Sequence, residues 1–125
     1  NVKHTMSCSS PTKGRWQGLA PMHCGYCVPC LIRRAAILAS FKTDDTRYAI
    51  PDLTERQLDA GKAEGRDVRS FQIATARLEQ NPNLAKSLIH KPGPLKDCIG
   101  ELEELEQMYL AGMNEVAQLL KDVAC

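Results

Sequence analysis

The sequence predicts an all-α domain in which a metal ion pins an irregular N-terminal loop, followed by about four helices, the last of them long. Three observations support this. Residues 95–124 repeat apolar side chains at helical spacing, and no segment sustains the apolar-polar alternation of a strand. Residues 1–30 show neither period and are rich in serine, proline, glycine and cysteine. Such a loop has no apolar core of its own, so another interaction, such as a bound metal ion, must hold it in place.

Length and composition favour a single domain spanning residues 1–125. Of the 125 residues 43% are apolar, which is ordinary for a protein that buries one core. Lysine and arginine number 16 against 15 acidic residues, so no bulk charge would recruit nucleic acid or an anionic membrane. No apolar run is long enough to cross a bilayer, and the N-terminus lacks the layout of a secretory signal. We expect a cytoplasmic protein without a membrane or direct nucleic-acid partner.

The first helices are expected from local pattern. The run CLIRRAAILASF, residues 30–41, combines good helix formers with apolar residues at helical spacing. A short helix is expected over 53–62, weakened by glycine, and a longer one over 67–80 with Asp67 as its N-cap. A turn of helix follows at 84–89, and the peptide HKPGP must then bend because proline cannot continue a helix.

The clearest helix is expected in residues 95–124. Two apolar seams run along it: Leu102, Tyr109, Val116 and Val123 in one, and Ile99, Met113 and Leu120 in the other. A helix with such seams either packs on the core of its own domain or pairs with a second copy in a coiled coil. Because only about three heptads are present, packing on the core is favoured, and a homo-oligomer is the alternative.

Four of the six cysteines form a ligand pattern: Cys8, Cys24, Cys27 and Cys30. Disulfides are disfavoured because a bridge between cysteines three apart is strained and no secretory signal is seen. An iron-sulfur cluster stays open, since C-x-x-C-x-x-C with a distant fourth cysteine is a ferredoxin-type spacing. A structural Zn²⁺ ion is favoured, because zinc prefers four thiolates in a tetrahedron and Gly25 supplies the backbone freedom that the turn needs.

Such a zinc ion would have no open coordination position, so its role would be structural. Its binding would contribute about 10 kcal/mol or more to folding, and with four thiolates it would change the formal charge from +1 to about −1. His4 and His23 flank the ligands, but four cysteines already complete the shell. Cys98 and Cys125 are too remote in sequence to belong to it.

The cysteine motif resembles that of a known family. SCSSPT followed by HCGYCVPCLIRRAA resembles the zinc-binding C-terminal segment of 7-cyano-7-deazaguanine synthases of the queuosine pathway. The longer match, through EGRDVRSFQ and IHKPGP, is similar to the synthase-like members encoded in Qat-type bacterial anti-phage operons. This resemblance implies that the chain is a fragment of a larger α/β protein, as Asn1 in place of an initiating methionine also suggests.

In that family an N-terminal PP-loop domain binds ATP through a Ser-Gly-Gly-x-Asp-Ser motif. It adenylates a carboxylate and uses ammonia to form a nitrile. Residues 1–125 contain no such motif, so the resemblance implies that ATP binds only in the missing domain. This chain alone is then not catalytic, and its first partner would be its own PP-loop domain.

The resemblance further implies that an arginine after the last cysteine lies near the nucleotide, which points to Arg33 first and then Arg34. The planar guanidinium group of arginine can donate two parallel hydrogen bonds to a phosphate or a carboxylate. A solvent-exposed helix face would explain the presence of both arginines equally well. Asp67 and Arg69 are explained as a cap and a surface cation. The alternative function is an interaction module that binds a partner protein of the same operon. A nucleic-acid-binding zinc finger is disfavoured because the helix offers only two arginines.

Overall fold

The structure, a computed structural model, describes residues 5–18 and 20–125, so Asn1 and His4 lie outside the described residues. These ranges contain helices and no strand: η2 (Lys13–Gln17), α1 (Val28–Phe41), α2 (Ala63–Gln80), α3 (Leu84–Leu88), η3 (Lys96–Glu101) and α4 (Leu102–Leu120). The predicted all-α class with about four α-helices and a long last one is confirmed. None of the helices in these ranges has the length and apolarity required to cross a membrane.

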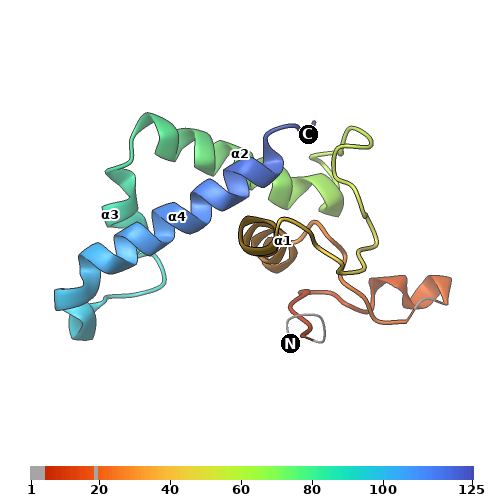
Figure 1. Cartoon of the computed structure of the whole chain (residues 1–125), viewed down its shortest axis with the longest axis horizontal. Coiled ribbons are helices and arrows are strands. Elements are labelled where there is room, and N and C mark those ends of the chain that lie inside the picture. The colour runs from red at the N-terminus through yellow and green to blue at the C-terminus, as the bar shows by residue number, and fades with distance from the viewer. Residues whose placement is uncertain (1–4, 19) are drawn as a thin grey trace.

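The longest helix, α4, crosses the molecule and organises the rest (Figure 1). It packs against α1, α2 and α3, and α3 links the far ends of α2 and α4. One buried cluster lies where α1, α2 and α4 meet: Leu31, Ala35, Leu53, Leu58, Val68, Val116, Leu120 and Val123. The N-terminal loop and η2 lie beyond α1, at the lower right of Figure 1. The core therefore holds α1 in place, and α1 carries the N-terminal loop.

Helix α1 begins within the cysteine motif. Cys27 is its extended N-cap, and Pro29 occupies one of the first two helical positions, where no intrahelical amide hydrogen bond is needed. Cys30 thus lies in the first turn, as the sequence predicted for a helix leaving the cysteines directly. The helix ends where Lys42 adopts a left-handed conformation and its amide donates to the Leu38 carbonyl at 3.0 Å.

The prediction of a short helix over 53–62 is wrong. Aspartate side chains accept hydrogen bonds from backbone amides there instead: Asp52 Oδ1 accepts from the Thr54 amide at 2.8 Å, and Asp59 Oδ1 accepts from the Gly61 amide at 2.9 Å. Such turns compete with helical hydrogen bonds. The segment still contributes Leu58 to the core, where the Leu58 amide donates to the Ala124 carbonyl at 2.9 Å.

Helix α2 begins earlier than expected. It starts at Ala63, so Asp67 lies inside the helix and its expected role as N-cap is wrong. Gly65 explains the early start, because a Cβ atom there would lie 2.5 Å from the backbone carbon and oxygen of Asp59. Only glycine lets the preceding turn pack so closely on the first turn of α2.

Helix α4 begins later than expected. Residues Lys96–Glu101 form the separate η3 element, in which Cys98 has non-helical angles (φ −119°, ψ 25°). Val116 and Leu120 of α4 are buried in the core, whereas Ile99 is 70% exposed. The expected packing on the core thus holds for the C-terminal half of the predicted seams.

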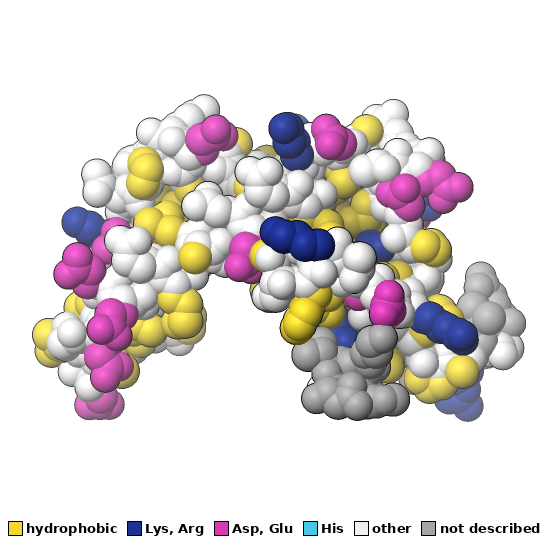
Figure 2. All heavy atoms as spheres, in the orientation of Figure 1, with side chains coloured by type: hydrophobic (Ala, Val, Ile, Leu, Met, Phe, Trp, Pro, Cys, Tyr) yellow, Lys and Arg dark blue, Asp and Glu magenta, His cyan; other side chains and the backbone are white. Residues whose placement is uncertain are grey.

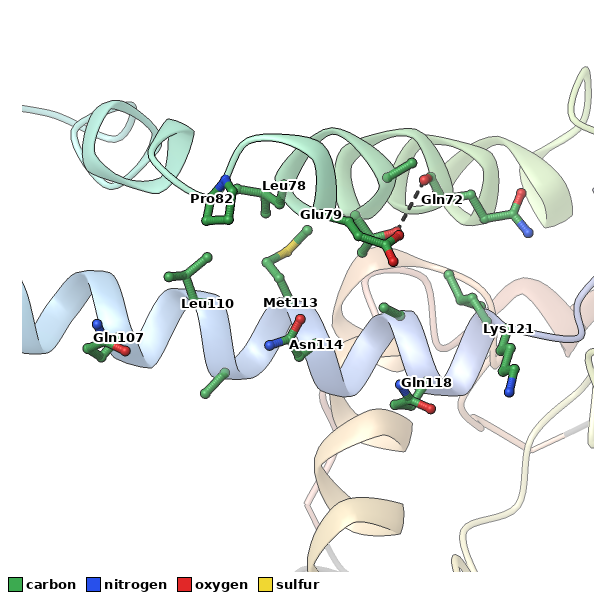
Figure 3. A pocket seen from close by; sticks show the side chains of 15 residues that line it. Gln72, Leu78, Glu79, Pro82, Gln107, Leu110, Met113, Asn114, Gln118 and Lys121 are labelled. Atoms are coloured by element: carbon green, nitrogen blue, oxygen red, sulfur yellow. Dashed lines mark hydrogen bonds between the residues drawn. The ribbon is translucent and has the colours of Figure 1, made fainter.

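A groove of about 810 Å³ separates α2 from α4 (Figure 3). Leu78 of α2 and Met113 of α4 point into it, and its rim mixes amide side chains with Glu79 and Lys121. None of the site residues predicted from the sequence lines this groove. The candidate site lies elsewhere, at the N-terminal end of α1.

Candidate metal centre

Three parts of the chain bring the four predicted ligands together. The N-terminal loop supplies Cys8, the turn before α1 supplies Cys24 and Cys27, and the first turn of α1 supplies Cys30. All four are buried, and their sulfur atoms lie within 4.8 Å of one another. The closest pairs, Cys8 with Cys27 and Cys24 with Cys30, have Sγ atoms 3.9 Å apart. The structure therefore assembles a four-sulfur cluster from residues up to 22 positions apart in sequence.

The spacing of the sulfurs suits a single ion. All six cysteines are free, and a disulfide would need a separation of about 2.05 Å. A tetrahedron with metal-sulfur bonds of about 2.3 Å has edges of roughly 3.8 Å, close to the shortest distances seen here. A multi-iron cluster places its thiolates on different irons and hence further apart. The site thus fits a structural metal such as zinc, held by a closed shell of four sulfurs.

Backbone amides point at the sulfurs, as they do around metal-bound thiolates. The amides of Ser10 and Cys24 both donate to Cys8 Sγ at 3.4 Å. The Cys27 amide donates to Cys24 Sγ, also at 3.4 Å. Cys27 and Cys30 additionally lie at the N-terminus of α1, where the helix dipole favours negative charge.

The thiols of Cys24, Cys27 and Cys30 differ in the direction of their pKa shifts. Burial raises the pKa of both Cys24 and Cys30. Burial acts in the same direction on Cys27, but hydrogen bonds from the side chain and backbone of Ser9 outweigh it and lower the Cys27 pKa to about 6. Four buried thiolates would need a compensating positive charge, which a divalent cation bound by all four sulfurs could supply.

His23, Cys98 and Cys125 lie outside the four-sulfur cluster. His23 is buried beside it, with Nδ1 3.7 Å from Cys30 Sγ and Nε2 3.2 Å from the Thr5 carbonyl oxygen. It therefore supports a ligand and is not one of the four. Cys98 and Cys125 are half-buried and remote from the cluster.

Arg34 connects the loop that carries Cys8, Cys24 and Cys27, which we call the metal loop, to the rest of the chain. Its Nη1 donates to the Gly25 carbonyl at 3.0 Å, and its Nη2 donates to the Ile50 carbonyl at 3.1 Å and to that of Pro51. The guanidinium also lies 4.0 Å from the centre of the Tyr48 ring. This buried side chain holds residues 48–51 against the turn that carries the cysteines.

Tyr48 and Asp44 complete this connection. The Tyr48 hydroxyl donates to Asp44 Oδ2 at 2.7 Å. Burial, reinforced by that hydrogen bond to a carboxylate, raises the pKa of Tyr48 to about 12. Sequence reasoning did not predict this role for either residue, because nothing in the local sequence marks which side chains of residues 44–51 face the metal loop.

Two backbone hydrogen bonds and one glycine bring the segments into contact. The Ala49 amide donates to the His23 carbonyl at 2.9 Å, and the Ile50 amide donates to the Cys24 carbonyl at 3.3 Å. Gly25 has a φ of +91°, and a Cβ atom there would lie 2.9 Å from the Ile50 oxygen. The predicted need for glycine is confirmed, and the structure adds the close approach of residue 50 as a second reason.

Arg33 is also buried, and its Nη1 donates to Thr5 Oγ1 at 2.8 Å. The structure thus places both predicted arginines beside the metal loop: Arg34 on the side of residues 48–51 and Arg33 on the side of Thr5. Their proximity to a nucleotide stays a prediction.

Comparison of the chain with protein-family models, with curated proteins and with solved structures returns no match. The four-sulfur site and the sequence motif that builds it are therefore the features that point to a function.

Proposed function

We propose that this chain is the structural zinc-binding C-terminal domain of a PP-loop ATP-dependent enzyme of the 7-cyano-7-deazaguanine synthase type. The observation that carries the proposal is the buried four-cysteine cluster, because it is built by the residues of the SCSSPT and HCGYCVPC motifs. The parent would form a nitrile or an amide on a 7-deazaguanine in the cytoplasm, in anti-phage defence. ATP would bind in the PP-loop domain.

The metal would act on folding and not on chemistry. Zinc would supply one tether between the N-terminal loop and α1, and Cys8, Cys24, Cys27 and Cys30 would fill its shell. The chain's own residues then position α1 and the two arginines after its first turn. Arg33 is the stronger candidate for approaching a nucleotide, because the fork of Arg34 already binds three backbone carbonyls of this chain.

Two measurements test this proposal separately. Elemental analysis should find one zinc per chain, which a Cys27→Ser variant loses; a coloured, iron-containing protein would contradict it. For the enzyme type, a protein with a PP-loop domain upstream of these residues should form AMP and pyrophosphate from ATP, 7-carboxy-7-deazaguanine and ammonia, and the 125-residue chain should not. AMP formation by the isolated chain, or a reading frame that begins with methionine a few residues before Asn1, would remove the proposal.

The second candidate is an interaction module for a protein of the same operon, with catalysis elsewhere. It is favoured by the exposed apolar side chains of α1, among them Val28, Ile32 and Phe41. A pull-down with the operon neighbours distinguishes the two functions. Binding that survives deletion of these 125 residues from the parent would exclude the interaction module.

A further inference from the structure

Charge is segregated along the chain. Residues 1–43 contain six lysines and arginines and no acid, whereas residues 44–125 contain ten against 15 acids, so the two parts carry +6 and −5. Two of the six cations, Arg33 and Arg34, are buried at the metal loop. Two others, Lys13 and Arg15, are exposed on a single short projection, residues 11–18, which we call the arm.

The arm presents the only tryptophan of the chain to solvent. Trp16 lies in η2 directly after Arg15 and is 96% exposed. The arm is nevertheless ordered: the Gly18 amide donates to the Arg15 carbonyl at 3.1 Å, and Lys13 Nζ lies 5.0 Å from the centre of the Tyr26 ring. An exposed tryptophan on a fixed turn is costly in water and typical of the anchor of an interface.

The opposite end of the molecule has the complementary character. Five carboxylates gather in η3 and the start of α4: Asp97, Glu101, Glu103, Glu104 and Glu106. In the part of the chain that the structure describes, none of them takes part in an ion pair. Exposed apolar side chains lie among them, with Ile99 at 70% and Met108 at 65% exposed. We call this region, residues 97–108, the acidic end; it lies at the lower left of Figure 2.

We propose that the arm of one copy of this chain docks on the acidic end of a second copy, and the reverse, in a two-fold dimer. The arm and the acidic end lie at opposite ends of the molecule (Figure 1), so neither can satisfy the other within one chain. A two-fold axis makes both contacts identical and closes the assembly. Trp16 is the anchor between Ile99 and Met108, and Lys13 and Arg15 face the carboxylates.

A nucleic acid fits this surface less well. The arm offers two cations and one aromatic ring, whereas single-strand binding uses several stacked aromatics along a basic groove. A second copy also provides a partner for the acidic end, which nucleic acid would leave without one.

The tryptophan provides the first test. On the purified, metal-loaded chain, the emission of Trp16 should shift to the blue and resist acrylamide as protein concentration rises, while sedimentation shows the mass doubling. Trp16→Ala should weaken association about tenfold or more, and added salt should weaken it as well. The proposal would be overturned if the chain stays monomeric and acrylamide quenches Trp16 emission at every protein concentration. It would also be overturned if only an added oligonucleotide protects Trp16 from quenching.

A charge swap gives the sharper test. Lys13→Glu/Arg15→Glu and Glu103→Lys/Glu104→Lys should each lose self-association about tenfold or more. Mixed in equal amounts, the two variants should associate again, because both contacts of the mixed dimer then join opposite charges. Arg66→Glu/Arg69→Glu changes the net charge equally at two exposed positions of α2 and should associate like the unaltered chain. Failure of the mixture to associate while both variants remain folded by circular dichroism would refute the dimer.

Discussion

At the scale of single residues, Arg34 shows how a motif position acquires a structural role. Its fork binds carbonyls from two segments far apart in sequence, Gly25 and residues 50–51. Lysine would keep the charge but cannot donate in several fixed directions at once. Arg34→Lys should therefore destabilise the protein by about 2–3 kcal/mol in urea denaturation. Arg69→Lys, at an exposed position, is the matched control, and equal stability of the two variants would contradict this role.

Gly25 and Gly112 form a matched pair of glycines. Gly25→Ala introduces a side chain at a φ of +91° and 2.9 Å from the Ile50 oxygen, so it should cost about 1–3 kcal/mol and weaken metal retention. Gly112 lies exposed within α4 with nothing near its Cβ direction, so Gly112→Ala should stabilise the helix by about 1 kcal/mol. Thermal unfolding of both variants measures the difference. Similar effects at the two positions would show that contact with Ile50 does not matter.

A single ion pair gives a pH-dependent prediction. Arg56 donates two hydrogen bonds to Glu64, at 2.8 and 2.7 Å, and thereby lowers the Glu64 pKa from 4.5 to about 2. Because the folded pKa is depressed, the pair stabilises the fold above pH 4.5, and this contribution is lost as pH falls toward 2. Glu64→Gln should thus have a lower melting temperature than the unaltered chain at pH 7, and the gap should close by pH 2. A gap independent of pH would exclude the ion pair as its source.

At the scale of elements, the metal loop and residues 44–51 behave as one unit. Residues 48–51 are held by the Ala49 and Ile50 amides bonded to the metal loop and by Arg34. Hydrogen exchange should therefore show faster exchange at both amides once a chelator removes the metal, whereas the amide of Leu120 in α4 stays protected. Cys8→Ser should reproduce the effect and Cys98→Ser should not. If the Ala49 amide stays equally protected after metal loss has been verified, the two segments do not behave as one unit.

Helix starts were the least predictable feature at this scale. The start of α2 depends on the approach of Asp59 to Gly65, and the boundary between η3 and α4 lies at Glu101, the N-cap of α4, whose angles are not helical (φ −111°, ψ 4°). Neither feature can be recognised from the spacing of apolar residues along the sequence. The apolar seam of α4 was predictable because its period is local, but only packing against α1 and α2 decides that its C-terminal half enters the core.

At the scale of the whole molecule, one helix spans two dissimilar ends. The C-terminal half of α4 is locked by the core, and its start lies with η3 among exposed acids. The metal loop and the arm lie at the other end (Figure 1). The core is thus offset from both predicted contact surfaces, which leaves them free to meet partners.

The sequence by itself determined the cysteine cluster and the fold class. Four cysteines at metal-site spacing and a helical period are local patterns, and both survive in the structure. Only the tertiary structure decided that Arg34, Tyr48 and Asp44 join the metal loop to residues 44–51. It also decided that the backbone of Asp59 packs closely on Gly65. The reason is physical: these roles depend on atoms brought together from distant parts of the chain, and residue type alone does not say which atoms will meet.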